Sequence, residues 1–170
     1  HAISLFDVVV FIDHGSEDGT YEFLKALEKS SRNIILYGLD EPGYIQSLTM
    51  NYIVENCDRL KDVDWIFPID ADEFLPFQDR QSFNSALIAR KNSPIITMHW
   101  MNVIPVEYWD FEVEIDENTE FYIPGTPSGY EKVAFQPGKL GGEPFWIDQG
   151  SHALFRAKRS YALRSADPGF

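Results

Sequence analysis

Trp65-Ile66-Phe67-Pro68-Ile69 runs directly into Asp70-Ala71-Asp72-Glu73-Phe74. The first five residues are apolar, which is typical of a strand buried on both faces of a parallel sheet. The next five carry three carboxylates at the predicted carboxyl end of that strand, the edge where open α/β sheets bind ligands. In an extended chain Asp70 and Asp72 point to the same side and can grip one hard cation, Mg²⁺ or Mn²⁺. The alternative is a solvated acidic turn.

A second acidic loop follows another apolar run, residues 8–12. It reads Asp13-His14-Gly15-Ser16-Glu17-Asp18-Gly19-Thr20 and leads into a helix predicted from about Thr20 to Lys29. We expect the Asp13 carboxylate to face the ligand crevice and accept from a ribose hydroxyl or a base N–H. Ser16 or Asp18 would either cap the helix or bind ligand. The loop lacks the lysine and the glycine spacing of the known phosphate-binding loops.

Strands and helices alternate along residues 1–104. Further strands are predicted at 33–37 and 95–103, and further helices at 44–56 and 81–90. The inward faces are expected to include Phe23 in the first helix and, in the second, Ile45, Leu48, Tyr52 and Ile53. This alternation indicates an α/β fold with a largely parallel sheet. Prolines and glycines crowd the chain after Pro105, so we expect one domain, 1–170, in which residues 105–170 form the acceptor or lid half.

Charge and composition restrict the possible functions. The 170 residues include 14 Lys plus Arg and 27 Asp plus Glu, a net charge of −13 that repels nucleic acids and anionic membranes. The single cysteine, Cys57, leaves no internal disulfide and no Cys-based zinc site, and is expected in the core. No apolar run is long enough for a transmembrane segment and no signal peptide is visible. We therefore expect a cytoplasmic chain, with membrane association left to parts outside it.

The two acidic loops together resemble glycosyltransferase family 2 and its relatives with the GT-A fold. The resemblance rests on Asp13-x-Gly15-Ser16-x-Asp18-Gly19-Thr20 after one strand and Asp70-Ala71-Asp72-Glu73-Phe74 after another, and covers roughly residues 1–100. It implies a Rossmann-like three-layer sandwich with a mostly parallel central sheet, and it makes residues 1–104 the nucleotide-binding half of the domain. Family members carry a strand and a helix before the position of Val8. The resemblance thus implies that the N-terminal strand is missing here, that residues 1–7 correspond to the end of that helix, and that the natural protein is longer.

The resemblance also implies an activity. The chain would transfer a sugar, with inversion, from a UDP- or GDP-type nucleotide sugar to a hydroxyl of a glycan, lipid or small-molecule acceptor. Asp13, Gly15 and Ser16 would bind the nucleotide. Asp70 would face the ribose or metal-bound water, and Asp72 would ligate Mn²⁺ or Mg²⁺ directly.

The second half supplies further candidates. In Asp148-Gln149-Gly150-Ser151-His152, His152 resembles the C-terminal histidine that adds a metal ligand in many GT-A enzymes. The alternative for His152 is a hydrogen-bonded residue of a loop. An inverting enzyme needs a general base, for which Asp148, Glu131 and Glu143 are available, and Asp148 is preferred because it neighbours His152. The basic residues would neutralise the leaving diphosphate or form a solvated tail: Arg156, Lys158, Arg159 and Arg164. Three tryptophans could stack on sugar rings: Trp109 and Trp146, which are better placed, and Trp100.

Two other functions stay open. In a phosphatase of the haloacid dehalogenase type, Asp70 would accept the phosphoryl group and Asp72 would be the general acid. That family places Thr or Val where this chain has Phe74, and places the motif near the start of the chain. The other alternative is a degenerate, non-catalytic GT-A domain that binds sugar or protein partners.

Overall fold

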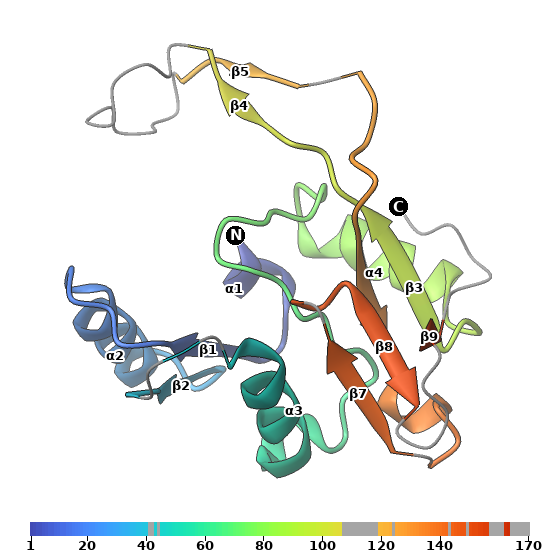
Figure 1. Cartoon of the computed structure of the whole chain (residues 1–170), viewed down its shortest axis with the longest axis horizontal. Coiled ribbons are helices and arrows are strands. Elements are labelled where there is room, and N and C mark those ends of the chain that lie inside the picture. The colour runs from blue at the N-terminus through green and yellow to red at the C-terminus, as the bar shows by residue number, and fades with distance from the viewer. Residues whose placement is uncertain are drawn as a thin grey trace. The chain divides into compact units, whose positions relative to one another are not determined.

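The computed structural model describes residues 1–40, 43, 45–106, 119–123, 125–142, 144–148, 150–156 and 162–163 (Figure 1). The chain divides into two compact units. Unit 1 comprises His1–Asp62 and Asp70–Asn92, and unit 2 comprises Val63–Ile69 and Ser93–Phe170. Both acidic loops therefore belong to unit 1, whereas the segment 148–152 belongs to unit 2.

Unit 1 alternates helices and strands. Its elements are α1 (Ala2–Leu5), β1 (Val9–Asp13), α2 (Thr20–Ser30), β2 (Ile34–Gly38), α3 (Gln46–Asn56), the short 3₁₀ helix Asp58–Leu60 and α4 (Arg80–Ala89). β1 and β2 pair in parallel, with Val9 opposite Ile34 and Asp13 opposite Gly38. Figure 1 shows this pair with α2 beside it. A Cβ at Gly38 would lie 3.0 Å from the Tyr21 ring, so the glycine lets α2 pack closely on β2. The helices and strands predicted for this part of the chain are confirmed.

Some side chains of β1 and α2 are less buried than the apolar sequence predicts. β1 was expected to be buried on both faces, but its first three residues are half-buried and Ile12 is exposed. β2 is the single strand paired with β1 among the described residues, and this small sheet covers less of β1 than a wide sheet would. Phe23 of α2 is also exposed and does not extend the apolar face of that helix.

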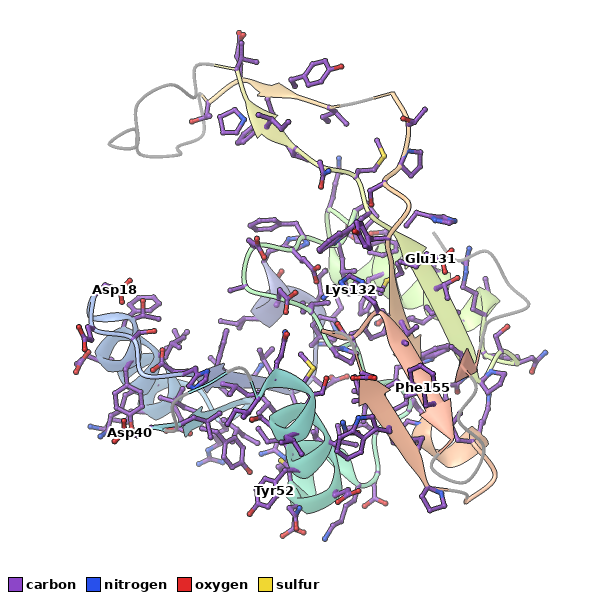
Figure 2. All side chains as sticks on the ribbon, viewed as in Figure 1. Asp18, Asp40, Tyr52, Glu131, Lys132 and Phe155 are labelled. Atoms are coloured by element: carbon purple, nitrogen blue, oxygen red, sulfur yellow. The ribbon has the colours of Figure 1, made fainter. Side chains whose placement is uncertain are left out.

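The inward face predicted for α3 is confirmed at Ile53 and wrong at Leu48 and Tyr52. Leu48 and Tyr52 are 60% and 61% exposed, whereas Thr49 and Ile53 are buried; Tyr52 is labelled in Figure 2. These two pairs have the same helical spacing and lie on adjacent faces of the helix. Burial of the polar Thr49 is possible because its hydroxyl donates to the Ile45 carbonyl at 3.0 Å.

Aromatic packing joins α4 to the rest of unit 1. Phe83 of α4 is 2% exposed, and its ring centroid lies 5.2 Å from those of both Phe6 and Phe77. Leu5 and Cys57 are also buried, and Cys57 is a free thiol. The expectation that Cys57 is a core residue is therefore confirmed.

Unit 2 consists mainly of short antiparallel strands. They are β3 (Ile95–His99), β4 (Ile104–Pro105), β5 (Phe121–Tyr122), β6 (Glu131–Phe135), β7 (Phe145–Asp148), β8 (Ala153–Arg156) and β9 (Ala162–Leu163), with a 3₁₀ helix at Pro137–Lys139. β3 pairs with β6, β4 with β5, and β7–β8–β9 form a three-stranded sheet, all antiparallel. The core contains residues with no exposed surface: Ile96, Ala134, Phe135, Ile147 and Leu154.

The segment 65–69 was predicted to be a buried strand. Instead it makes one antiparallel bridge, in which Ile66 and Phe135 exchange two backbone hydrogen bonds of 2.8 and 3.0 Å. Pro68 has no N–H to extend the pairing, which gives a physical reason why the ladder stops there.

The α/β prediction thus holds as a mixed helix and strand fold with small sheets. Within the described residues only the β1–β2 pairing is parallel, so the largely parallel sheet is not seen there. The predicted strand 95–103 also ends early, at His99. In the described part of the chain, no helix has the length and apolarity to cross a membrane.

Candidate functional site

The carboxylate of Asp13 orders the loop that follows β1. Asp13 is the last residue of β1 and is 5% exposed. Its Oδ1 accepts from the Ser16 N–H at 3.1 Å, and its Oδ2 accepts from the Ser16 hydroxyl at 2.5 Å. Gly15 between them has φ of +70°, a conformation that favours glycine. The structure therefore brings Asp13, Gly15 and Ser16 together, with Ser16 held by Asp13.

Asp18, rather than Ser16, holds the start of α2. Its Oδ1 accepts from the N–H of Thr20, the first residue of the helix, at 3.0 Å. Hydrogen bonds from the Thr20 side chain and backbone lower the pKa of Asp18 below its ordinary value. Gly19, with φ of +89°, makes the turn into the helix. Gly19 is the N-cap residue, and Asp18 before it accepts from the first N–H of the helix; the Asp18 side chain, labelled in Figure 2, is exposed.

The second acidic loop is a closed turn anchored to α3. The Asp70 N–H donates to Glu73 Oε2 at 2.8 Å, and the Glu73 N–H donates to the Asp70 carbonyl at 3.1 Å. Gln46, the first residue of α3, donates from Nε2 to Asp70 Oδ1 at 2.8 Å. Asp70 and Glu73 are half-buried, whereas Asp72 is exposed. This arrangement fixes the backbone of the turn and leaves the Asp72 carboxylate in solvent.

Gln46 is the positioning residue that the sequence did not reveal. It lies 24 positions before Asp70, at the start of a helix whose next residue, Ser47, is also polar. A single glutamine in that place is common and carries no pattern that would connect it with a distant aspartate.

The chemistry of the Asp70–Glu73 turn fits a hard cation. Carboxylate oxygens are the ligands that Mg²⁺ uses, commonly one or two from the protein together with phosphates of the substrate. Nowhere in the described residues do three or more His, Cys, Asp or Glu side chains lie close enough to hold a metal ion. A metal ion at this turn would therefore need ligands beyond Asp70 and Asp72.

His152 lies in unit 2, at the turn between β7 and β8. Its Nδ1 lies 2.6 Å from the Glu131 carbonyl, and its ring packs 5.1 Å from Trp100 and 5.8 Å from Tyr130. This hydrogen bond agrees with the alternative interpretation of His152, in which it is a hydrogen-bonded residue of a loop. A carbonyl can only accept, so Nδ1 carries the proton and a neutral ring would present Nε2 as the basic nitrogen. The same geometry is common for histidines that bind metals through Nε2.

The general-base candidates differ in their surroundings. Asp148 ends β7 and lies opposite Ala153 of β8, so it shares the β7–β8 hairpin with His152. Glu131 is half-exposed, and its Oε1 lies 3.5 Å from Nδ1 of His99. Two of the stacking candidates are half-buried: Trp100 and Trp146. Five further candidates for stacking, general base or diphosphate binding lie outside the described residues: Trp109, Glu143, Lys158, Arg159 and Arg164. The backbone of Arg156 is described, but its side chain is not.

The structure adds a buried lysine that was not predicted. Lys132 of β6 is 2% exposed, and its Nζ donates to the Gly150 carbonyl at 2.5 Å and to Ser151 Oγ at 2.9 Å (Figure 2). The ammonium also lies 5.4 Å from the centre of the Trp100 ring. Ser151 is fully buried and has φ of +70°. Lys132 thereby ties β6 to the turn that carries His152.

Comparisons with protein-family models, with curated proteins and with solved structures found no match for this chain.

Proposed function

We propose that this chain is a metal-dependent glycosyltransferase with a GT-A fold. It would transfer a sugar from a nucleotide-diphosphate sugar to an acceptor hydroxyl. The observation that carries the proposal is the Asp70–Glu73 turn. Its backbone is closed on itself, Asp70 is anchored by Gln46, and the Asp72 carboxylate remains exposed at the end of the motif.

Each loop of unit 1 has a part in this proposal. The Asp13–Ser16 loop would contact the nucleoside, with its shape set by the hydrogen bonds between Asp13 and Ser16. Asp70 and Asp72 would hold Mn²⁺ or Mg²⁺, which when bound would offset the charge of the diphosphate. Gln46 would keep Asp70 in a fixed orientation for this role.

Residues of unit 2 would serve the acceptor side. Asp148 would remove the proton of the acceptor hydroxyl during an in-line displacement that inverts the sugar carbon. His152 would offer Nε2 as a metal ligand, with its ring oriented by the Glu131 carbonyl.

Metal-dependent nucleotide binding tests the proposal directly. Titration calorimetry of the chain with UDP or GDP should show binding that requires Mn²⁺ or Mg²⁺. Asp72→Asn should abolish the metal-dependent part and leave the circular dichroism spectrum unchanged, because Asp72 is exposed. Asp62→Asn, an exposed aspartate of the same unit, is the matched control and should bind as the unaltered chain does.

Three results would overturn parts of the proposal. Nucleotide binding that ignores both the metal and Asp72→Asn would remove the site assignment. Metal-dependent binding without any release of nucleotide from a UDP- or GDP-sugar would favour the non-catalytic alternative. Phosphate release from a phosphomonoester that is lost in Asp70→Asn would favour the phosphatase.

A further inference from the structure

The turn at residues 150–152 is held by neighbouring residues of β6. The Lys132 ammonium donates from Nζ to the Gly150 carbonyl at 2.5 Å and to Ser151 Oγ at 2.9 Å; Lys132 is labelled in Figure 2. The Val133 N–H donates to the Ser151 carbonyl at 3.0 Å. A main-chain N–H is present whatever the residue, whereas the two bonds from Nζ depend on a lysine. The side-chain part of this attachment therefore rests on Lys132.

The conformation of Ser151 depends on contacts from outside the turn. This residue is fully buried and has φ of +70°, in the left-handed region that a residue with a side chain seldom adopts. Such a conformation persists only where the surrounding structure enforces it. The Ser151 hydroxyl accepts from Lys132 and donates to the Gly150 carbonyl, which also accepts from Lys132. Without Lys132, we expect Ser151 to relax towards an ordinary backbone conformation and the next residue, His152, to move with it.

The ring of His152 is fixed by contacts that also lead back to Lys132. Its Nδ1 donates to the Glu131 carbonyl at 2.6 Å, and its centroid lies 5.1 Å from that of the Trp100 ring. The Lys132 ammonium lies 5.4 Å from the centre of the Trp100 ring, where cation–π attraction favours it. Lys132 thus reaches His152 by two routes, through the backbone of the turn and through the indole of Trp100.

We propose that Lys132 is a positioning residue for His152 and sets the direction in which its Nε2 points. The ammonium is buried, with Lys132 2% exposed, and acts through the turn and through Trp100. The orientation of the ring is independent of sugar transfer, whereas its consequence for metal binding rests on the proposed function, in which Nε2 is a metal ligand. A ligand already held in its binding orientation loses less conformational freedom on binding, and residues that orient a metal ligand contribute about 10- to 100-fold in affinity.

Nitrogen NMR of the His152 ring tests the positioning on the full chain without any metal. At about pH 8.5 an ordinary histidine is neutral, and one tautomer with the proton on Nδ1 gives two well-separated ring nitrogen shifts. Lys132→Met should bring these shifts closer together, because a released ring samples both tautomers. The control Ile95→Ala removes a buried side chain at the far end of the β3–β6 pair, opposite Phe135, and should leave both shifts unchanged. Unchanged shifts in Lys132→Met would overturn the proposal.

Metal affinity tests whether Lys132 acts through His152. Calorimetry with Mn²⁺ in the presence of UDP should show binding that is weaker by about tenfold in Lys132→Met. In a chain that already carries His152→Ala, the same substitution should cause no further loss, because the group that Lys132 orients is gone. Additive losses would give Lys132 a general role in stability and overturn the proposal. Stronger Mn²⁺ binding by Lys132→Met would mean that the ammonium acts by repelling the cation, with the same consequence.

The two measurements distinguish this proposal from the proposed function. If the unaltered chain binds no Mn²⁺ but the ring shifts respond to Lys132→Met, the positioning is supported and the metal assignment of His152 is wrong. If Mn²⁺ binds but the ring shifts do not respond, the positioning is wrong and the metal assignment stands. If Lys132→Met loses its far-ultraviolet circular dichroism, Ser151→Ala replaces it. That variant removes the bond between Lys132 and Ser151 and should move the ring shifts in the same direction by a smaller amount, so unchanged shifts would again overturn the proposal.

Discussion

Replacement of Lys132 by methionine should destabilise unit 2 by about 2 kcal/mol. The ammonium is buried and donates to the Gly150 carbonyl and to Ser151 Oγ. Hydrogen bonds from a charged donor contribute roughly 1.5–3 kcal/mol each. Removing a buried charge also removes its desolvation cost, which for an ion amounts to several kcal/mol and offsets much of that loss. Methionine keeps most of the side-chain volume, so a cavity adds little.

Urea denaturation followed by circular dichroism measures this change as a lower free energy of unfolding. Lys29→Met is the matched control, because Lys29 is exposed in the last turn of α2, and it should shift the free energy by less than about 0.5 kcal/mol. A double-mutant cycle with Ser151→Ala isolates the bond between Lys132 and Ser151, and should give a coupling energy of about 1 kcal/mol.

The opposite outcome is physically possible and would refute the reasoning. Buried ionic groups in other proteins have been replaced by apolar residues with a gain in stability. If Lys132→Met is as stable as the unaltered chain, the hydrogen bonds at the Gly150–Ser151 turn do not outweigh the desolvation of the ammonium. Additivity within error in the cycle would show that the Lys132–Ser151 bond contributes nothing measurable.

Three other substitutions test the packing and capping of unit 1. Phe83→Ala should lower the free energy of unfolding by about 3–5 kcal/mol, because it removes a buried ring from an aromatic cluster; a loss below about 1 kcal/mol would contradict that burial. Asp79→Ala should lower the melting temperature, since its carboxylate caps α4 by accepting from the Ser82 N–H at 2.7 Å. That hydrogen bond lowers the pKa of Asp79 below its ordinary 3.8, so the stabilisation is present above that pH and is lost as the pH falls through the folded pKa. The difference in melting temperature between Asp79→Ala and the unaltered chain should thus be constant near neutrality and shrink in acid, and a constant difference down to strong acid would refute it. Asp13→Ala should cost about 1–3 kcal/mol and speed hydrogen exchange at the Ser16 amide, which it leaves without an acceptor; an unchanged exchange rate would exclude that bond.

The elements of unit 1 were largely predictable because their signals are local. The apolar runs at 8–12 and 33–37, and the helical spacing in 20–29 and 81–90, each fix an element within a few residues. Orientation was less predictable, as α3 shows. Leu48 and Tyr52 are more apolar than Thr49, yet Thr49 is buried because a bond to its own helix satisfies the hydroxyl. Hydropathy alone does not record that bond.

In the candidate site too, local interactions were predictable from the sequence and long-range ones were not. Sequence placed Asp13 and Asp70 after strand-like runs, and the local bonds of Asp13 to Ser16 and of Asp70 to Glu73 lie within three residues. The bonds of Gln46 to Asp70 and of Lys132 to Gly150 span 24 and 18 residues. Contacts over such separations depend on how the elements pack, and a single glutamine or lysine gives no sign of them. Lys132 follows Glu131 at the start of β6, where an exposed position would be the natural expectation for a lysine.

The two aspartates that the sequence assigned to one ligand stand in opposite physical situations. Both carboxylate oxygens of the buried Asp13 accept hydrogen bonds from Ser16, so this side chain acts first on the backbone of its own loop. Asp72 is exposed on a turn whose shape is set by the neighbouring Asp70 and Glu73. Loss of Asp13 must therefore change loop order and stability together with any binding. Loss of Asp72 can change binding alone, which is why the calorimetric test of nucleotide binding is placed on Asp72.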